Sequence, residues 1–228
     1  MTWLLISINV VVFIYMVALG ESLRGVEFIF DYAFVPARWA AEPLGAAPTL
    51  ISSMFMHGGW MHLLGNMAFL VVFGDNVEDR MGRFAFLAFY LLGGIAASLA
   101  HALLEGPSPV PLIGASGAIS AVLGAYIVLY PRQRVLTFIP PLFLPWLVVS
   151  LFFRVPRFFL VWLPAWLFIG YWVVVQLFEA GARLGELGTG ATGVAWWAHI
   201  GGFVVGLTLV KLFERRGAVA QGAGSISP

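Results

Sequence analysis

Long apolar stretches alternate along the chain with short polar segments in which the charged residues gather. A helix needs about 20 apolar residues to cross a bilayer, and six stretches meet this requirement. They comprise residues 3–20, 58–74, 84–104, 112–130, 158–178 and 194–213. The pattern therefore predicts an all-α polytopic membrane protein with six transmembrane helices.

A further apolar stretch, residues 135–153, is long enough to cross but contains Pro140, Pro141 and Pro145. Proline removes a backbone donor and breaks helices, so we expect a kinked interfacial or re-entrant segment. If this segment crossed, every later helix would run in the opposite direction.

The composition agrees with a membrane protein, since 61% of the 228 residues are hydrophobic and only 10% are charged. A mean hydropathy of +0.95 leaves too little polar surface for a soluble protein of this size. The net charge of +1 gives no indication of a nucleic-acid partner, and the absence of cysteine excludes thiol catalysis and cysteine-bound metals. Trp3 to Leu19 lacks a basic lead-in and a cleavage site, so we interpret it as a retained span.

The distribution of Lys and Arg predicts the orientation, because cytoplasmic loops carry the excess of these residues. With the N-terminus inside, nine of the twelve lie on the cytoplasmic side, and only Arg24, Arg38 and Arg183 lie outside. Both termini are then cytoplasmic, and the aromatic-rich segment 21–57 lies outside, against the membrane interface.

Polar side chains are costly inside a span unless they have partners, so each is a functional candidate. His62 and Asn66 share one helix face at the start of the second span, while Ser116 and His199 start the fourth and sixth. All three spans run from outside to inside, which places these four residues at a similar depth near the outer surface.

Small residues predict that the fourth and sixth helices cross closely, because they let backbones approach. One small face contains Ser116, Ser120 and Gly124, and the other follows His199 with Gly202 and Gly206. Such a crossing brings the imidazole within hydrogen-bond reach of the Ser116 hydroxyl. This is a nucleophile with its base.

Serine attack on an amide also needs donors for the developing oxyanion. His62 and Asn66 can supply side-chain donors, and the backbone N–H of Ser116 is free at a helix start. We expect Gly114 and Gly117 to leave room for the substrate backbone. A metalloprotease His-Glu-x-x-His motif is absent, and no pair of carboxylates lies within the spans, so we expect neither a metal nor a cofactor.

These residues stand in motifs that resemble those of the rhomboid intramembrane serine proteases: "HGGWMHLLGN", "FGDNVEDRMG", "GASG" and "AHIGGFVVG". The resemblance implies a six-helix bundle, a water-accessible cavity open to the outer side, and cleavage of transmembrane proteins near the outer leaflet. It also implies that Ser116 is the nucleophile, His199 the general base, and His62 with Asn66 the oxyanion donors. Some relatives carry a Tyr beneath the histidine ring, where this chain has Ser120.

The expected organisation is one rhomboid-like protease domain, residues 1–214, followed by a short disordered tail, residues 215–228. Its expected partners are transmembrane protein substrates and the lipid bilayer, and its expected location is the plasma (inner) membrane of a bacterium. The alternative is a catalytically silent rhomboid-like protein that binds transmembrane helices. A transporter fits less well, because its polar residues would continue to the membrane midplane.

Overall fold

A computed structural model describes residues 1–138, 160–182 and 195–215, and most of these residues are helical. This confirms the predicted helical class. Four of the described helices are long and apolar enough to cross a membrane: α1 (Thr2–Leu19), α8 (Arg83–Glu105), α11 (Ala165–Ala182) and α12 (Trp196–Phe213). The count of six spans stays a prediction.

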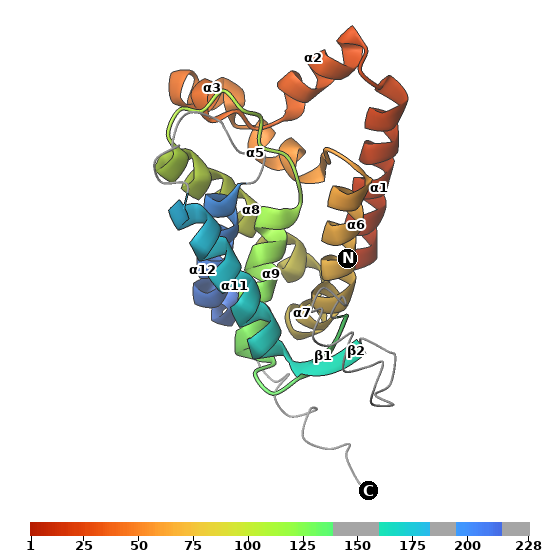
Figure 1. The fold of residues 1–228 in the computed structure, drawn as a ribbon, viewed down its shortest axis with the longest axis vertical. Coiled ribbons are helices and arrows are strands. Elements are labelled where there is room, and N and C mark those ends of the chain that lie inside the picture. Colours follow the sequence, from red (N-terminus) through yellow and green to blue (C-terminus); the bar gives the residue numbers. More distant parts are fainter. Residues whose placement is uncertain (139–159, 183–194, 216–228) are drawn as a thin grey trace, which may run out of the picture.

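The segment after α1 forms a cap of short helices across one end of the bundle (Figure 1). It contains α2 (Leu23–Tyr32), α3 (Pro36–Ala41), α4 (Pro43–Ala46), α5 (Thr49–Ser52) and the 3₁₀ turn η1 (Ser53–Phe55). Proline stands in the first turn of α3 and of α4, where its missing N–H costs nothing. The predicted interfacial segment 21–57 is therefore largely helical.

The helical segment at the second predicted span, 58–74, continues beyond the end of that span. It comprises α6 (Trp60–Phe69), a π-helical stretch η2 (Leu70–Gly74) and α7 (Asp75–Met81), which follow one another without a break. The polar sequence of α7 suggested a loop, but its two acidic residues in the first turn and Arg80 in the last turn suit a helix.

Helix α9 (Ser116–Leu129) lies at the centre of the bundle and is shorter than the predicted span 112–130. Its 14 residues extend only about 21 Å at 1.5 Å per residue. Residues before Ser116 are held as a loop, because Leu112 pairs with Phe34 and the Gly114 N–H donates to the Ser53 carbonyl. Neighbouring helices bury most of α9, so little of it needs to meet lipid.

Helices α9 and α12 are in backbone contact. A Cβ atom added to Gly202 would lie 2.2 Å from the Gly117 carbonyl oxygen, and one added to Gly206 would lie 2.0 Å from that of Ala121. From the other side, a Cβ on Gly124 would lie 2.3 Å from the Phe203 oxygen. The small-residue crossing that the sequence suggested is therefore present.

The end of the bundle away from the cap carries a two-stranded antiparallel hairpin, β1 (Arg134–Phe138) and β2 (Leu160–Pro164) (Figure 1). The predicted fifth span, 158–178, thus begins as a strand and becomes helical only at Ala165, continuing to Ala182. Most of the proline-containing segment 135–153 lies outside the described residues. Its described flanks, Phe138 and Leu160, are paired, so the chain leaves and re-enters the described part at one place.

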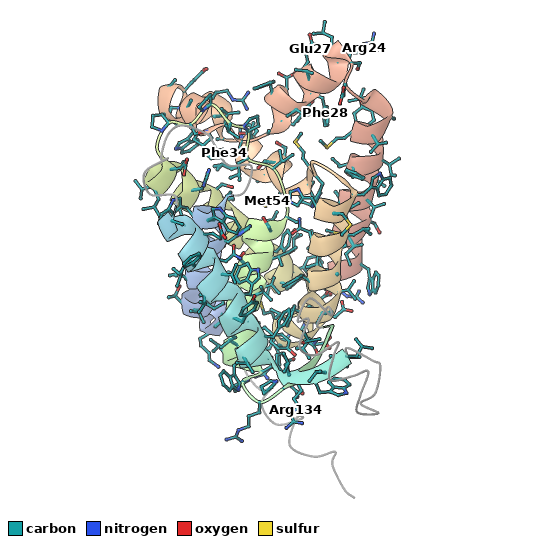
Figure 2. All side chains as sticks on the ribbon, in the orientation of Figure 1. Arg24, Glu27, Phe28, Phe34, Met54 and Arg134 are labelled. Carbon is teal, nitrogen blue, oxygen red and sulfur yellow. The ribbon has the colours of Figure 1, made fainter. Side chains whose placement is uncertain are left out.

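The same end joins α7 to the end of α12. Arg80 and Lys211 both pair with Glu214, and the Arg215 side chain donates to the Met81 carbonyl. Hydrogen bonds from Lys211 and Arg80 hold the pKa of Glu214 below its ordinary value. Figure 2 shows Arg134 at this end and Arg24 and Glu27 at the far tip of the cap.

Candidate active site

Ser116 and His199 stand at the first turns of α9 and α12, where these helices cross. The distance from His199 Nε2 to Ser116 Oγ is 2.9 Å, a hydrogen bond. The glycine contacts between the two helices set this distance, because they fix the backbones on which both side chains stand. The structure therefore brings two residues 83 positions apart into the hydrogen-bonded arrangement that a serine nucleophile and its base require.

The other ring nitrogen of His199 meets a residue that sequence reasoning missed. Gln176 of α11 places its amide oxygen 2.6 Å from His199 Nδ1. Trp172, one turn earlier on the same helix, and Trp196 flank the ring at centroid distances of 5.7 and 6.2 Å. A signal was available: Gln176 is a lone polar residue inside the predicted fifth span, near its outer end and at the depth of His199.

His62 of α6 faces the serine from the opposite side. Its Nδ1 accepts a hydrogen bond from the Gly58 N–H, at 3.4 Å, so in the neutral ring the hydrogen is on Nε2. Nε2 lies 2.8 Å and Ser116 Oγ lies 3.7 Å from the point where a Gly114 side chain would begin. The His62 Nε2–H and the Ser116 hydroxyl thus border one small space. His57 packs edge-on against the His62 ring.

Gly114 is required here for two reasons. Its φ of +127° is a conformation that L side chains rarely adopt, and a Cβ there would collide with His62. A Cβ on Gly117 would lie 2.7 Å from the Cβ of Ala97 in α8. Neither position could therefore carry a side chain, while the expectation that these glycines leave room for the substrate backbone stays a prediction.

Asn66 lies one turn after His62 and is 9% exposed. Its amide nitrogen has no hydrogen-bond partner among the described residues, which is costly for a buried donor. The Ser116 N–H lies in the first turn of α9, where helix donors have no partner within the helix. These groups are placed to donate to an incoming oxygen.

All four predicted side chains line one cavity of about 670 Å³. Apolar residues of α6, α9 and α11 form much of its wall, and the loop before α9 covers another side. They include Met61, Phe69, Val110, Pro111, Leu112, Ile113, Ile119, Leu123 and Trp172. The site combines an apolar cleft with a few convergent polar groups, as ligand sites commonly do.

Comparison with known proteins agrees with this geometry. The family model of the Rhomboid domain matches residues 45–216, which include every residue of the site. The chain belongs to the rhomboid family. The resemblance seen in the sequence motifs is thereby confirmed.

Three relatives indicate the range of this rhomboid family. RHOMBOID-like protein 5 of Arabidopsis thaliana is 37% identical over 33% of this chain and 25% of its own length. Rhomboid protein 1, mitochondrial, of Saccharomyces cerevisiae is 30% identical over 62% of this chain and 40% of its own. Rhomboid protease GluP of Bacillus subtilis is 32% identical over 59% of this chain and 26% of its own. The chain thus spans well under half the length of these rhomboid relatives.

Proposed function

We propose that this rhomboid-family chain is an active intramembrane serine endopeptidase that cleaves transmembrane proteins near the outer leaflet. The observation that carries the proposal is the 2.9 Å hydrogen bond between Ser116 Oγ and His199 Nε2 inside a cleft that also contains His62 and Asn66. A protease among the relatives, GluP, supports it.

The reaction uses each group in turn. Ser116 Oγ attacks the scissile carbonyl carbon as its proton passes to His199 Nε2, which acts as general base. The carbonyl oxygen becomes an oxyanion and accepts hydrogen bonds from His62 Nε2–H, the Asn66 amide and the Ser116 N–H. His199 then gives its proton to the leaving amine nitrogen as the C–N bond breaks. Water then attacks the acyl carbonyl carbon as its proton passes to His199, and His199 returns that proton to Ser116 Oγ as the ester C–O bond breaks and the acid product leaves.

The surroundings of the site support an intramembrane substrate. The exposed faces of α1 and α11 are apolar, with Trp3, Val11 and Phe178 among the exposed side chains, which suits contact with lipid. We assign the protease to residues 1–214, with 215–228 as a tail. We place the chain in a bacterial plasma membrane, where the excess of Lys and Arg predicts cytoplasmic N- and C-termini and a cleft that opens outward.

The test is cleavage of a generic transmembrane substrate by detergent-purified protein, with Ser116→Ala and His199→Ala alongside. Both variants should lose cleavage, because each removes one member of the nucleophile and base pair. A serine-directed fluorophosphonate should label the wild type and not Ser116→Ala. Cleavage that persists in Ser116→Ala would overturn the assignment of the nucleophile.

The second candidate, a silent relative that binds transmembrane helices, is favoured by the apolar cleft, which would suit a helix without chemistry. It predicts no fluorophosphonate labelling of the wild type. Retained binding of the substrate helix by both Ser116→Ala and wild type, without cleavage in either, would establish it.

A further inference from the structure

Gln176 is a buried polar side chain in an otherwise apolar stripe of α11. The stripe also contains Ala165, Ile169 and Ala180, spaced so that all four lie on the face toward the bundle. Gln176 is only 5% exposed. A buried amide without a hydrogen bond is energetically costly. The hydrogen-bond partner of Gln176 therefore accounts for a polar side chain at this position.

That partner is His199. The Gln176 amide oxygen can only accept a hydrogen bond, so at 2.6 Å the donor must be an N–H at His199 Nδ1. A neutral imidazole carries one ring hydrogen, so Nε2 then presents its lone pair to Ser116 Oγ at 2.9 Å. This is the tautomer that a general base needs. With the hydrogen on Nε2, the ring could not accept the proton of Ser116.

Among the described residues, the other neighbours of the His199 ring do not hold the Nδ1 hydrogen. The Ser120 hydroxyl donates to the Ser116 carbonyl at 2.6 Å. Trp172 and Trp196 limit the tilt of the ring, but an indole N–H only donates, so neither can hold the hydrogen of Nδ1.

We propose that Gln176 is the positioning residue of the catalytic histidine. It fixes the tautomer and orientation of His199 and completes a hydrogen-bonded chain of Ser116, His199 and Gln176, which stand on α9, α12 and α11. The inference rests on the proposed protease function and adds a third residue to Ser116 and His199. A neutral amide orients the ring without burying a charge in the membrane, where a carboxylate would be expensive.

The experiment measures the rate of fluorophosphonate labelling of Ser116 against pH in the full chain. Gln176→Leu should label about 10- to 100-fold more slowly, a smaller loss than the ~10⁴ seen when a soluble triad holds the wrong tautomer. Leucine suits a buried position in an apolar span, so folding should survive, as the thermal midpoint in detergent would verify. Phe178→Leu is the control on the same helix, because Phe178 is 72% exposed.

Gln176→Glu separates positioning from packing. The carboxylate keeps an acceptor for Nδ1, so labelling should recover to within about tenfold of wild type at neutral pH or above. Its charge favours the imidazolium, so the acid limb of the pH–rate profile should move to higher pH. His62 and His101, which interact electrostatically with His199, are unchanged in every variant.

If Gln176→Leu is labelled at the wild-type rate and with the wild-type pH–rate profile, the inference is overturned and the protease function still stands. Equal losses in Gln176→Leu and Gln176→Glu, with lowered thermal midpoints and no shift of the acid limb, would show a structural role and also overturn it. A wild type that never labels would remove the protease function itself, and this inference with it.

Discussion

At the scale of single residues, Asn66 gives a sharp test of the oxyanion site, because its buried amide nitrogen has no partner among the described residues. Asn66→Leu should slow cleavage by up to about 10²-fold, at or below the 10²–10³ for one lost donor in a soluble protease, since His62 and the Ser116 N–H remain. Removing an unsatisfied amide should leave the thermal midpoint unchanged or raised.

Met67→Leu is the matched control, since Met67 is the next residue of α6, is buried, and changes little in volume. Its cleavage rate should stay near wild type. Normal cleavage by Asn66→Leu and also by the double variant His62→Ala/Asn66→Leu would mean that the oxyanion donors lie elsewhere.

The sequence motifs, placed at one depth by the span order, predicted that Ser116, His199, His62 and Asn66 come together, and these four side chains do line one cavity, while their roles stay predictions. Two features were not predicted from the sequence. Gln176 stands outside any motif, and only the packing of α11 against α12 brings it to the ring. The tautomer of His62 depends on the Gly58 N–H, a backbone contact that no residue pattern encodes.

At the scale of elements, the contact between α9 and α12 should tolerate no added atom. Gly206→Ala places a Cβ 2.0 Å from the Ala121 oxygen, so the helices must separate. Misplacing reacting groups by about 1 Å can cost on the order of 10²-fold in rate. We therefore expect Gly206→Ala to lower both the cleavage rate and the thermal midpoint.

Gly170 of α11 is the control, because a Cβ there meets nothing within 4 Å. Gly170→Ala should stabilise by up to about 1 kcal/mol through helix propensity alone. The same substitution should thus have opposite effects on thermal unfolding at the two sites. If Gly206→Ala were as stable and active as wild type, the close contact of the two helices would not set the distance between Ser116 and His199, the proposed catalytic dyad.

Hydrophobic runs predicted where helices lie better than where they end. Val161 to Leu163 belong to the predicted fifth span but pair with β1, because tertiary pairing overrides the local preference of an apolar run. Residues 112–115 are apolar but form the loop that places Ser116, held by contacts to Phe34 and Ser53. Such long-range contacts are invisible to local periodicity.

At the scale of the molecule, the cap and the hairpin mark opposite ends (Figure 1). The dyad stands at the starts of α9 and α12, and the loop before α9, which is paired to the cap segment through Phe34, covers the cleft. The excess of Lys and Arg predicts that the cap lies outside and the hairpin inside. A peptide would then reach Ser116 from the outer side of the membrane.

The cysteine-free sequence allows this orientation to be tested with single cysteines and an impermeant maleimide in intact cells and in inverted vesicles. Leu23→Cys, on the exposed start of α2, should be labelled from outside, while Gln133→Cys and Leu160→Cys should be labelled only from the cytoplasmic side. These positions keep every Lys and Arg, so the charge bias is unchanged. Labelling of 133 and 160 from opposite sides would contradict the β1–β2 pairing. If all three positions are labelled from the sides opposite to those expected, the fold and the dyad still stand, but the cleft faces the cytoplasm. Substrates would then be cut near the inner leaflet.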